Sequence, residues 1–255
     1  MKITILQRPG HFTSKEFSSN LENTLHLLKG DLAASIKPDG LSQKGWARLD
    51  LQGEDSEVLK ELLARDLGQA QTNLTDIEAQ GVYEGIISSR VNDNLEVDIG
   101  IESPTPVNVR VGLGALRAQL ADGKPLRGSE IIQEYCLYPG SRATVRITRL
   151  EPEAHILEGW LADSQIDHLA SWIATRLDRI QISDSFRREV EYAIKKSTIE
   201  RDIVSVEPMT LTMHSVVCKL GTDAVGLIPK LGSALRQREL NPFIPKRIIT
   251  RCRPW

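Results

Sequence analysis

The positions of the arginines give the clearest indication of a binding site in this sequence. Arg142 and Arg146 lie four residues apart in a segment of alternating polar and apolar residues, so they would share one face of a strand. Arg247 and Arg251 have the same spacing near the C-terminal end. A guanidinium group is planar and donates parallel hydrogen bonds that suit phosphate oxygens. The positions that predict contact with a phosphate backbone are Arg110, Arg117, Arg142, Arg146, Arg247, Arg251 and Arg253.

The charge distribution leaves two interpretations of these arginines open. Residues 201–255 carry nine Lys and Arg against four Asp and Glu, whereas the whole chain has a net charge of −2. A local excess of positive charge is typical of a surface that binds a polyanion. It also fits a basic segment that docks on acidic residues of 1–78 or 151–200 in the same chain, or on a partner protein.

The segment from Gly221 to Gly226 lies between a predicted strand and a predicted helix. Backbone N–H groups and the positive end of the helix dipole can bind an anion at such a turn. Gly221, Thr222, Asp223 and Gly226 are therefore candidates for an anion-binding turn. The segment lacks the lysine of a P-loop, and it is similar to the strand-to-helix turn of ACT-type regulatory domains, which bind amino acids. In the simplest alternative, Asp223 or Thr222 only caps the helix.

No set of residues predicts a metal, a cofactor or catalysis. His214 and Cys218 would share a strand face, but the other histidines are scattered, and a metal needs further ligands. Cys136, Cys218 and Cys252 lie far apart in strand-like sequence, so we expect buried thiols. The sequence has no Gly-x-Ser-x-Gly or His-Glu-x-x-His motif. We expect a non-catalytic protein without a cofactor, although a site built from distant residues would leave no motif.

The elements that would position these residues predict an α+β protein of three domains. Residues 1–78 follow the order βαββα, and residues 151–255 predict a helical hairpin and a βαβ layer that ends in a strand at 247–253. Residues 79–150 combine alternating strands with a short helix at 113–120, which predicts a small barrel of the oligonucleotide-binding (OB) type. The expected extended segments of this barrel are residues 82–87, 95–99, 107–111, 131–138 and 142–149.

The composition is that of an ordinary soluble protein, with 40% hydrophobic and 26% charged residues. No apolar run approaches the roughly 18 residues that a membrane-spanning helix needs. Residues 1–6 have the pattern of a strand rather than of a signal peptide. We therefore expect a cytoplasmic protein with no membrane contact.

Several segments carry a resemblance to a known family. They are residues 97–100, 201–207 and 216–228, together with Gly85, Gly114 and Gly232. These segments resemble an uncharacterised archaeal family known as domain of unknown function 2110, and the likeness covers most of residues 80–235. The resemblance implies an archaeal cytoplasmic protein and implies no activity.

The barrel and the arginines together favour a non-catalytic RNA-binding or ribonucleoprotein-associated protein of archaeal information processing. The predicted barrel contains only three aromatic residues, Tyr83, Tyr135 and Tyr138, so base stacking would be sparse. Two other hypotheses stay open. The chain would be a protein–protein interaction scaffold if the basic segment docks on acidic residues, or a ligand-sensing module if the turn at 221–226 is an open pocket.

Overall fold

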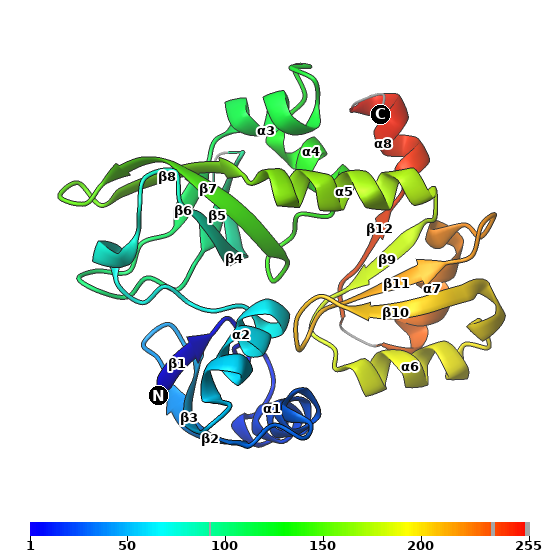
Figure 1. Cartoon of the computed structure of the whole chain (residues 1–255). Helices are drawn as coiled ribbons and strands as arrows, with labels where there is room; N and C mark the ends of the chain where they lie inside the picture. The colour runs from blue at the N-terminus through cyan, green and yellow to red at the C-terminus, as the bar shows by residue number, and fades with distance from the viewer. Residues whose placement is uncertain (92, 236–237, 253–255) are drawn as a thin grey trace.

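The computed structural model describes residues 1–91, 93–235 and 238–252, and it confirms an α+β fold. Figure 1 shows an N-terminal module of strands and helices below a barrel, with a second sheet beside them on the right. Within the described ranges no helix is long and apolar enough to cross a membrane.

The N-terminal module has the predicted order βαββα. Its elements are β1 (Lys2–Ile5), α1 (Ser14–Lys29), β2 (Ala34–Leu41), β3 (Ala47–Gly53) and α2 (Ser56–Leu67). The three strands are antiparallel in the order β1-β3-β2, and the buried leucines of both helices pack on one face of this sheet. Thr13 and Glu16 form a reciprocal capping box at the start of helix α1.

The barrel is closed by five strands. They are β4 (Val82–Val91), β5 (Asn94–Asp98), β6 (Val109–Val111), β7 (Arg142–Glu151) and β8 (Ile156–Leu161). The strands are ordered β4-β5-β6-β8-β7, and only β6 and β8 pair in parallel among them, as in an OB fold. The fifth strand therefore lies beyond residue 150, which the sequence interpretation took as the end of the barrel. The turn at residues 152–155 is a tight reversal between β7 and β8 and not an exit from the barrel.

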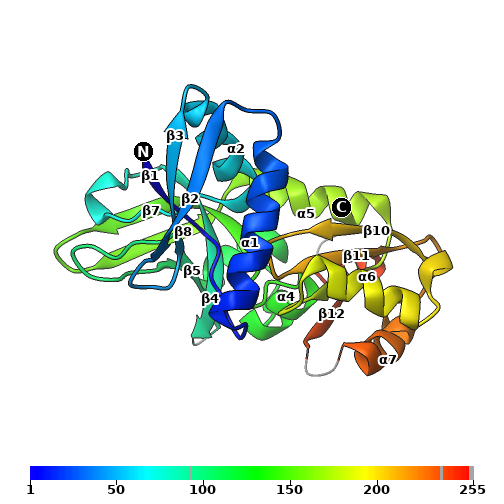
Figure 2. The ribbon, with the colours of Figure 1, turned by 90° about the horizontal axis from the view of Figure 1, so that it is seen from below.

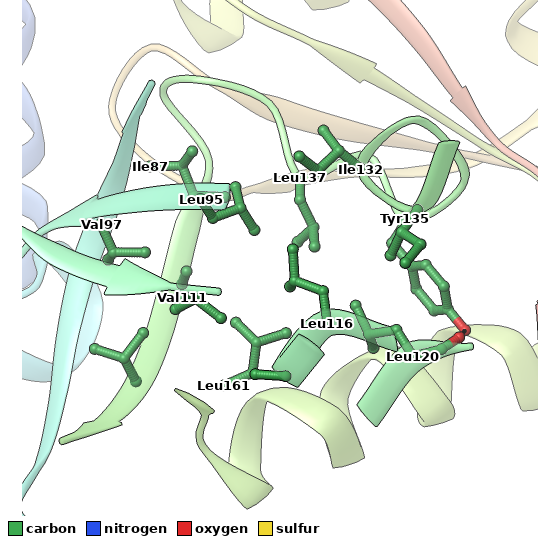
Figure 3. Packing of buried hydrophobic residues seen from close by; sticks show 14 of the residues in the cluster. Ile87, Leu95, Val97, Val111, Leu116, Leu120, Ile132, Tyr135, Leu137 and Leu161 are labelled. Carbon is green, nitrogen blue, oxygen red and sulfur yellow. Dashed lines mark hydrogen bonds between the residues drawn. The ribbon is translucent and has the colours of Figure 1, made fainter. Parts of the chain in front are cut away.

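Two helices, α3 (Leu113–Leu120) and α4 (Gly128–Glu134), connect β6 to β7. The extended segment expected at 131–138 begins with α4 instead, because the buried residues Gly128, Ile131, Ile132 and Tyr135 recur at helical spacing. Figure 3 shows side chains of α3, α4 and the following loop packed against those of the barrel strands. The hydroxyl of Tyr135 donates a hydrogen bond of 2.7 Å to the carbonyl oxygen of Leu120, which fixes α4 against α3.

The C-terminal module contains the two predicted helices, but a strand separates them. Its elements are α5 (Asp163–Thr175), β9 (Arg179–Ile182), α6 (Arg187–Lys196), β10 (Ile203–Pro208), β11 (His214–Cys218), α7 (Ala224–Ala234), β12 (Leu240–Phe243) and α8 (Pro245–Arg251). The strands form one sheet in the order β10-β11-β9-β12. Helices α6 and α7 pack on one face of this sheet, as Figure 2 shows from below. Single turns of 3₁₀ helix lie at Leu74–Asp76 and Glu200–Asp202.

The strand predicted at 247–253 is helix α8, as far as the described residues extend. Pro245 occupies the first turn of this helix, where its missing N–H costs nothing. Ile248 and Cys252 are buried four residues apart. Residues four positions apart lie on the same face of a helix and also on the same face of a strand, so the pattern alone does not distinguish the two structures.

Side chains from all three modules meet. Helix α5 extends from the barrel to the C-terminal sheet (Figure 1), and Phe243, Ile248 and Cys252 belong to the same hydrophobic core as the barrel strands. The turn between β2 and β3 docks on the barrel, because Lys44 Nζ lies 2.6 Å from Asp98 Oδ1 in a largely buried ion pair. The modules therefore share cores and buried contacts.

Candidate nucleic-acid interface and central cavity

The two C-terminal arginines of α8 are held within the chain. Arg247 Nε and Arg251 Nη1 each donate a hydrogen bond of 2.5 Å to the carboxylate of Glu134 in α4, and Arg251 also contacts Glu130 at 3.1 Å. Glu134 is only 2% exposed, so its charge depends on these partners. This is the arrangement expected if the basic segment docks on its own chain, although the acidic partners lie within residues 79–150. Arg253 lies outside the described residues.

Arg142 and Arg117 also hold structure together. The guanidinium group of Arg142 donates to the carbonyl oxygens of Asp66 and Arg65 at 3.0 and 3.2 Å, and to Glu84 at 2.5 Å. It thereby links the C-terminal end of α2 to the barrel, and three of its donors are occupied. Arg117 Nε donates to the carbonyl oxygen of Leu126 at 2.7 Å and closes the loop between α3 and α4.

Arg110, Arg146 and Arg149 remain on the outer surface of the barrel. Each forms an ion pair with a neighbouring carboxylate. Arg110 contacts Glu96 at 3.4 Å, Arg146 contacts Asp163 at 2.9 Å, and Arg149 contacts Glu151 at 2.7 Å and Glu158 at 3.6 Å. These side chains stay between 38% and 53% exposed.

Trp160 is the residue of this surface that the sequence interpretation missed. It lies on β8 directly opposite Arg146 and is 48% exposed, although tryptophan is usually buried. Trp160 alternates with the inward-facing Gly159 and Leu161, so its position would have been visible had β8 been assigned to the barrel. We call Arg110, Arg146, Arg149 and Trp160 the arginine–tryptophan face.

The turn at 221–226 is closed by acidic side chains of the chain itself. Asp223 caps α7, as the simplest alternative predicted, and its carboxylate accepts hydrogen bonds from the N–H groups of Val225 and Gly226, both at 3.1 Å. The N–H group of Ala224 donates to Asp178 at 3.4 Å. Gly221 has a φ of +86°, which permits the tight turn that follows β11. The first amides of α7 thus already have anionic acceptors.

The three cysteines are buried and unpaired, as expected. Burial raises the pKa of Cys218 to about 12 and that of Cys252 to about 11, and it also raises the pKa of Cys136. His214 and Cys218 share one strand, but no group of His, Cys, Asp or Glu within the described ranges could hold a metal ion. These thiols therefore contribute to packing in the folded protein.

A central cavity of about 370 Å³ lies where the three modules meet. Its wall is formed by Arg142 and Thr144 of β7, by α5, and by residues of β9 and β10, with Arg65 of α2 at its edge. Gln181 of β9 lines it and is 2% exposed, yet its Oε1 atom has no hydrogen-bond partner within the described part of the chain. Sequence reasoning could not find this cavity, because its walls come from elements that are far apart in the chain.

These features define a class of protein: a three-module α+β protein built around a closed OB-type barrel, with an exposed arginine–tryptophan face and a central cavity lined by both polar and apolar residues. Residues 177–241, which form most of the C-terminal sheet with α6 and α7, match the family model of the DUF2110 C-terminal domain. The likeness to the DUF2110 family is therefore shown for this C-terminal domain. None of the curated proteins compared with the chain is significantly similar to it.

Proposed function

We propose that the chain is a non-catalytic RNA-binding or ribonucleoprotein-associated protein of archaeal information processing, and that it binds single-stranded RNA on the arginine–tryptophan face. The observation that carries this proposal is the exposure of Trp160 beside Arg146 on the outside of an OB-type barrel. Such barrels bind single strands by stacking bases on aromatic side chains while cations contact the phosphates. A cytoplasmic location and an archaeal source belong to the same proposal.

The ion pairs on this face set a limit on how strongly it attracts phosphate. The arginines at 110, 146 and 149 are outnumbered by the carboxylates of Glu96, Glu151, Glu158 and Asp163 around them. Exposed ion pairs of this kind contribute only about 0–1 kcal/mol, so a phosphate can displace the carboxylate at low cost. We expect modest affinity, with stacking on Trp160 as a major contribution.

A fluorescence-anisotropy titration with labelled single-stranded RNA tests the proposal. Three phosphate contacts predict a slope of about −2 in a plot of log affinity against log salt, measured between about 50 and 200 mM. Replacing Trp160 with Ala should weaken binding by about 5- to 150-fold, because a base–aromatic stack contributes about 1–3 kcal/mol. Trp160→Phe should retain most of the affinity.

Tyr192 supplies the matched control, because it is an aromatic residue on α6 that is 64% exposed and lies away from the barrel. Tyr192→Ala should bind RNA like the wild type. If Trp160→Ala and Tyr192→Ala bind equally well, the arginine–tryptophan face is not the RNA site. If the wild type does not bind RNA at the lower salt concentration, the proposed function is wrong.

A further inference from the structure

A groove of about 590 Å³ lies between the N-terminal module and the C-terminal sheet. Asn20, Thr24, Leu27 and Leu28 line it from one side of α1, and residues 208–211 line it from the end of β10 and the turn that follows. The side chains of Asn20 and Thr24 already donate hydrogen bonds to carbonyl oxygens of α1. Leu27 is 80% exposed. The wall formed by α1 therefore offers aliphatic surface to an occupant.

The opposite wall of the groove is also aliphatic. Met209 and Leu211 line it and are partly buried. The two aromatic rings in the lining, Phe186 and His214, are only 7% and 2% exposed, so neither offers a free face for stacking. A contiguous aliphatic surface is typical of an interaction site for peptide side chains, whereas bases bind on exposed aromatic rings. The groove is therefore suited to leucine-like side chains of a partner.

One cation at the edge of the groove is available to an anion from outside the chain. Arg188 is exposed and forms no ion pair or hydrogen bond within the described ranges. The other arginines of the groove already have carboxylate partners: Arg65 pairs with Asp66, Arg142 with Glu84, and Arg187 with Glu191. The free positive charge of the groove thus lies at the start of α6.

This charge continues as a stripe along α6. Arg188, Tyr192 and Lys196 recur at intervals of four residues, so they lie on one side of the helix over about 12 Å. Tyr192 is 64% exposed, and Lys196 Nζ lies 5.9 Å from the centroid of its ring. Lys195 and Lys196 form no ion pair with any described residue, whereas both glutamates of α6 pair with arginines. The stripe therefore carries positive charge that the chain does not neutralise.

We propose that this surface docks an acidic amphipathic helix of a partner protein. We call it the α1–α6 groove and define it by Leu27, Leu28, Met209 and Leu211 with the stripe Arg188, Tyr192 and Lys196. The aliphatic side chains of the partner helix cover the leucines, and its carboxylates pair with the cations of the stripe. An amphipathic helix presents apolar and acidic residues side by side, as these two parts of the surface require. The α1–α6 groove shares no residue with the arginine–tryptophan face, so the proposal does not depend on RNA binding.

The test uses two fluorescein-labelled peptides of about 15 residues with leucines at helical spacing. One peptide carries glutamates at the polar positions and the other carries lysines. In a fluorescence-anisotropy titration the acidic peptide should bind at least about tenfold more tightly than the basic one. The difference should shrink when the salt concentration is raised from about 50 to about 200 mM, because exposed charges are screened.

Two exposed positions separate the aliphatic and the charged contributions. Leu27→Ser should weaken binding of the acidic peptide by about tenfold, the loss expected for one buried leucine. Leu220→Ser is the matched control, because Leu220 is 79% exposed on the turn after β11 and does not line the groove. Arg188→Glu should weaken binding by at least about tenfold. Arg90→Glu in β4 makes the same change of charge at another exposed arginine and should leave binding unchanged.

Absence of binding of the acidic peptide, or equal binding by the wild type, Leu27→Ser and Arg188→Glu, would overturn the proposal. Two other occupants give distinct results that would also overturn it. A wild type that is dimeric in sedimentation velocity, with monomeric Leu27→Ser, would show that a second copy covers the groove. Loss of single-stranded RNA binding in Arg188→Glu but not in Trp160→Ala would show that the surface binds RNA. Trp160→Ala should leave peptide binding unchanged, so the peptide test and the RNA test fail independently.

Discussion

Arg251 Nη1 lies 2.5 Å from Oε1 of Glu134, although the two residues are 117 positions apart in the sequence. With Arg247 on the second oxygen of the same carboxylate, this pair attaches α8 to α4. The positive charge of the C-terminal segment therefore compensates a buried carboxylate of the barrel module.

Removing the two cations should destabilise the protein more than removing the carboxylate. Arg247→Met and Arg251→Met together keep the aliphatic stems but leave Glu134 buried and unpaired, which should cost about 3–5 kcal/mol. Glu134→Gln leaves two arginines that are 33% and 46% exposed and can be hydrated. This variant should therefore lose only about 1–2 kcal/mol of stability. Urea unfolding measures both, and adding Glu134→Leu to the double variant should restore part of the lost stability. An equal cost for the double variant and Glu134→Gln would contradict this account.

His214 should make stability fall in mild acid. Burial is the main reason that the pKa of His214 is lowered from 6.5 to about 4, and the charge of Arg187 adds to it. Below pH 6.5 the unfolded chain takes up a proton that the folded chain does not bind until about pH 4. Stability should therefore decrease across this interval by up to about 3 kcal/mol.

The check is urea unfolding of the wild type and His214→Gln at pH 7 and pH 4.5. The variant should lose about 2–3 kcal/mol less than the wild type between these two values. Carboxylates titrate in both proteins, so only the difference between the two losses reports on His214. Identical losses would show that His214 is not the group responsible.

The thiols should be inert in the folded protein. All three cysteines are buried, and burial raises their pKa values, so the reactive thiolate is scarce at pH 8. Reaction with a chromogenic disulfide reagent should be negligible in native buffer and should reach three thiols per chain in guanidinium chloride. Fast labelling of one thiol under native conditions would show that its part of the core opens readily.

Two glycines in helices should respond to alanine in opposite directions. A Cβ atom on Gly128 would lie 2.2 Å from the carbonyl oxygen of Asp93. Gly128→Ala should therefore lower the free energy of unfolding by about 1–3 kcal/mol or more. A Cβ atom on Gly232 meets nothing within 4 Å, and Gly232→Ala should stabilise α7 by about 0.5–1 kcal/mol. Thermal unfolding of the two variants checks the contrast, and destabilisation by both would contradict it.

Much of the fold was predictable because alternation and helical spacing are local signals. The strands around Val97 and Val145, the helix that contains Leu116 and the order of the N-terminal module all follow from such patterns. The predictions failed where a local pattern fits two structures. The spacing of four from Arg247 to Arg251 suits both strand and helix, and the Pro152 turn within the barrel has the composition of a linker.

The candidate sites were less predictable than the fold, because pairing and burial are three-dimensional properties. Nothing in the sequence indicates that Arg247 meets Glu134 or that Arg142 reaches the carbonyl oxygens of α2. Trp160 was missed for a different reason, since it lies on the strand that was left out of the barrel. Asp223 was recognised as a helix cap because capping depends on neighbouring residues.

β12, α8 and the barrel share one hydrophobic core, and this affects how the protein folds during translation. Phe243, Ile248 and Cys252 pack in the same cluster as the barrel strands, yet they leave the ribosome long after β8 has been synthesised. Until these residues emerge, part of the apolar surface of the nascent barrel is therefore exposed to solvent. We expect this interval during translation, rather than the finished protein, to be the stage at which chaperones are most needed.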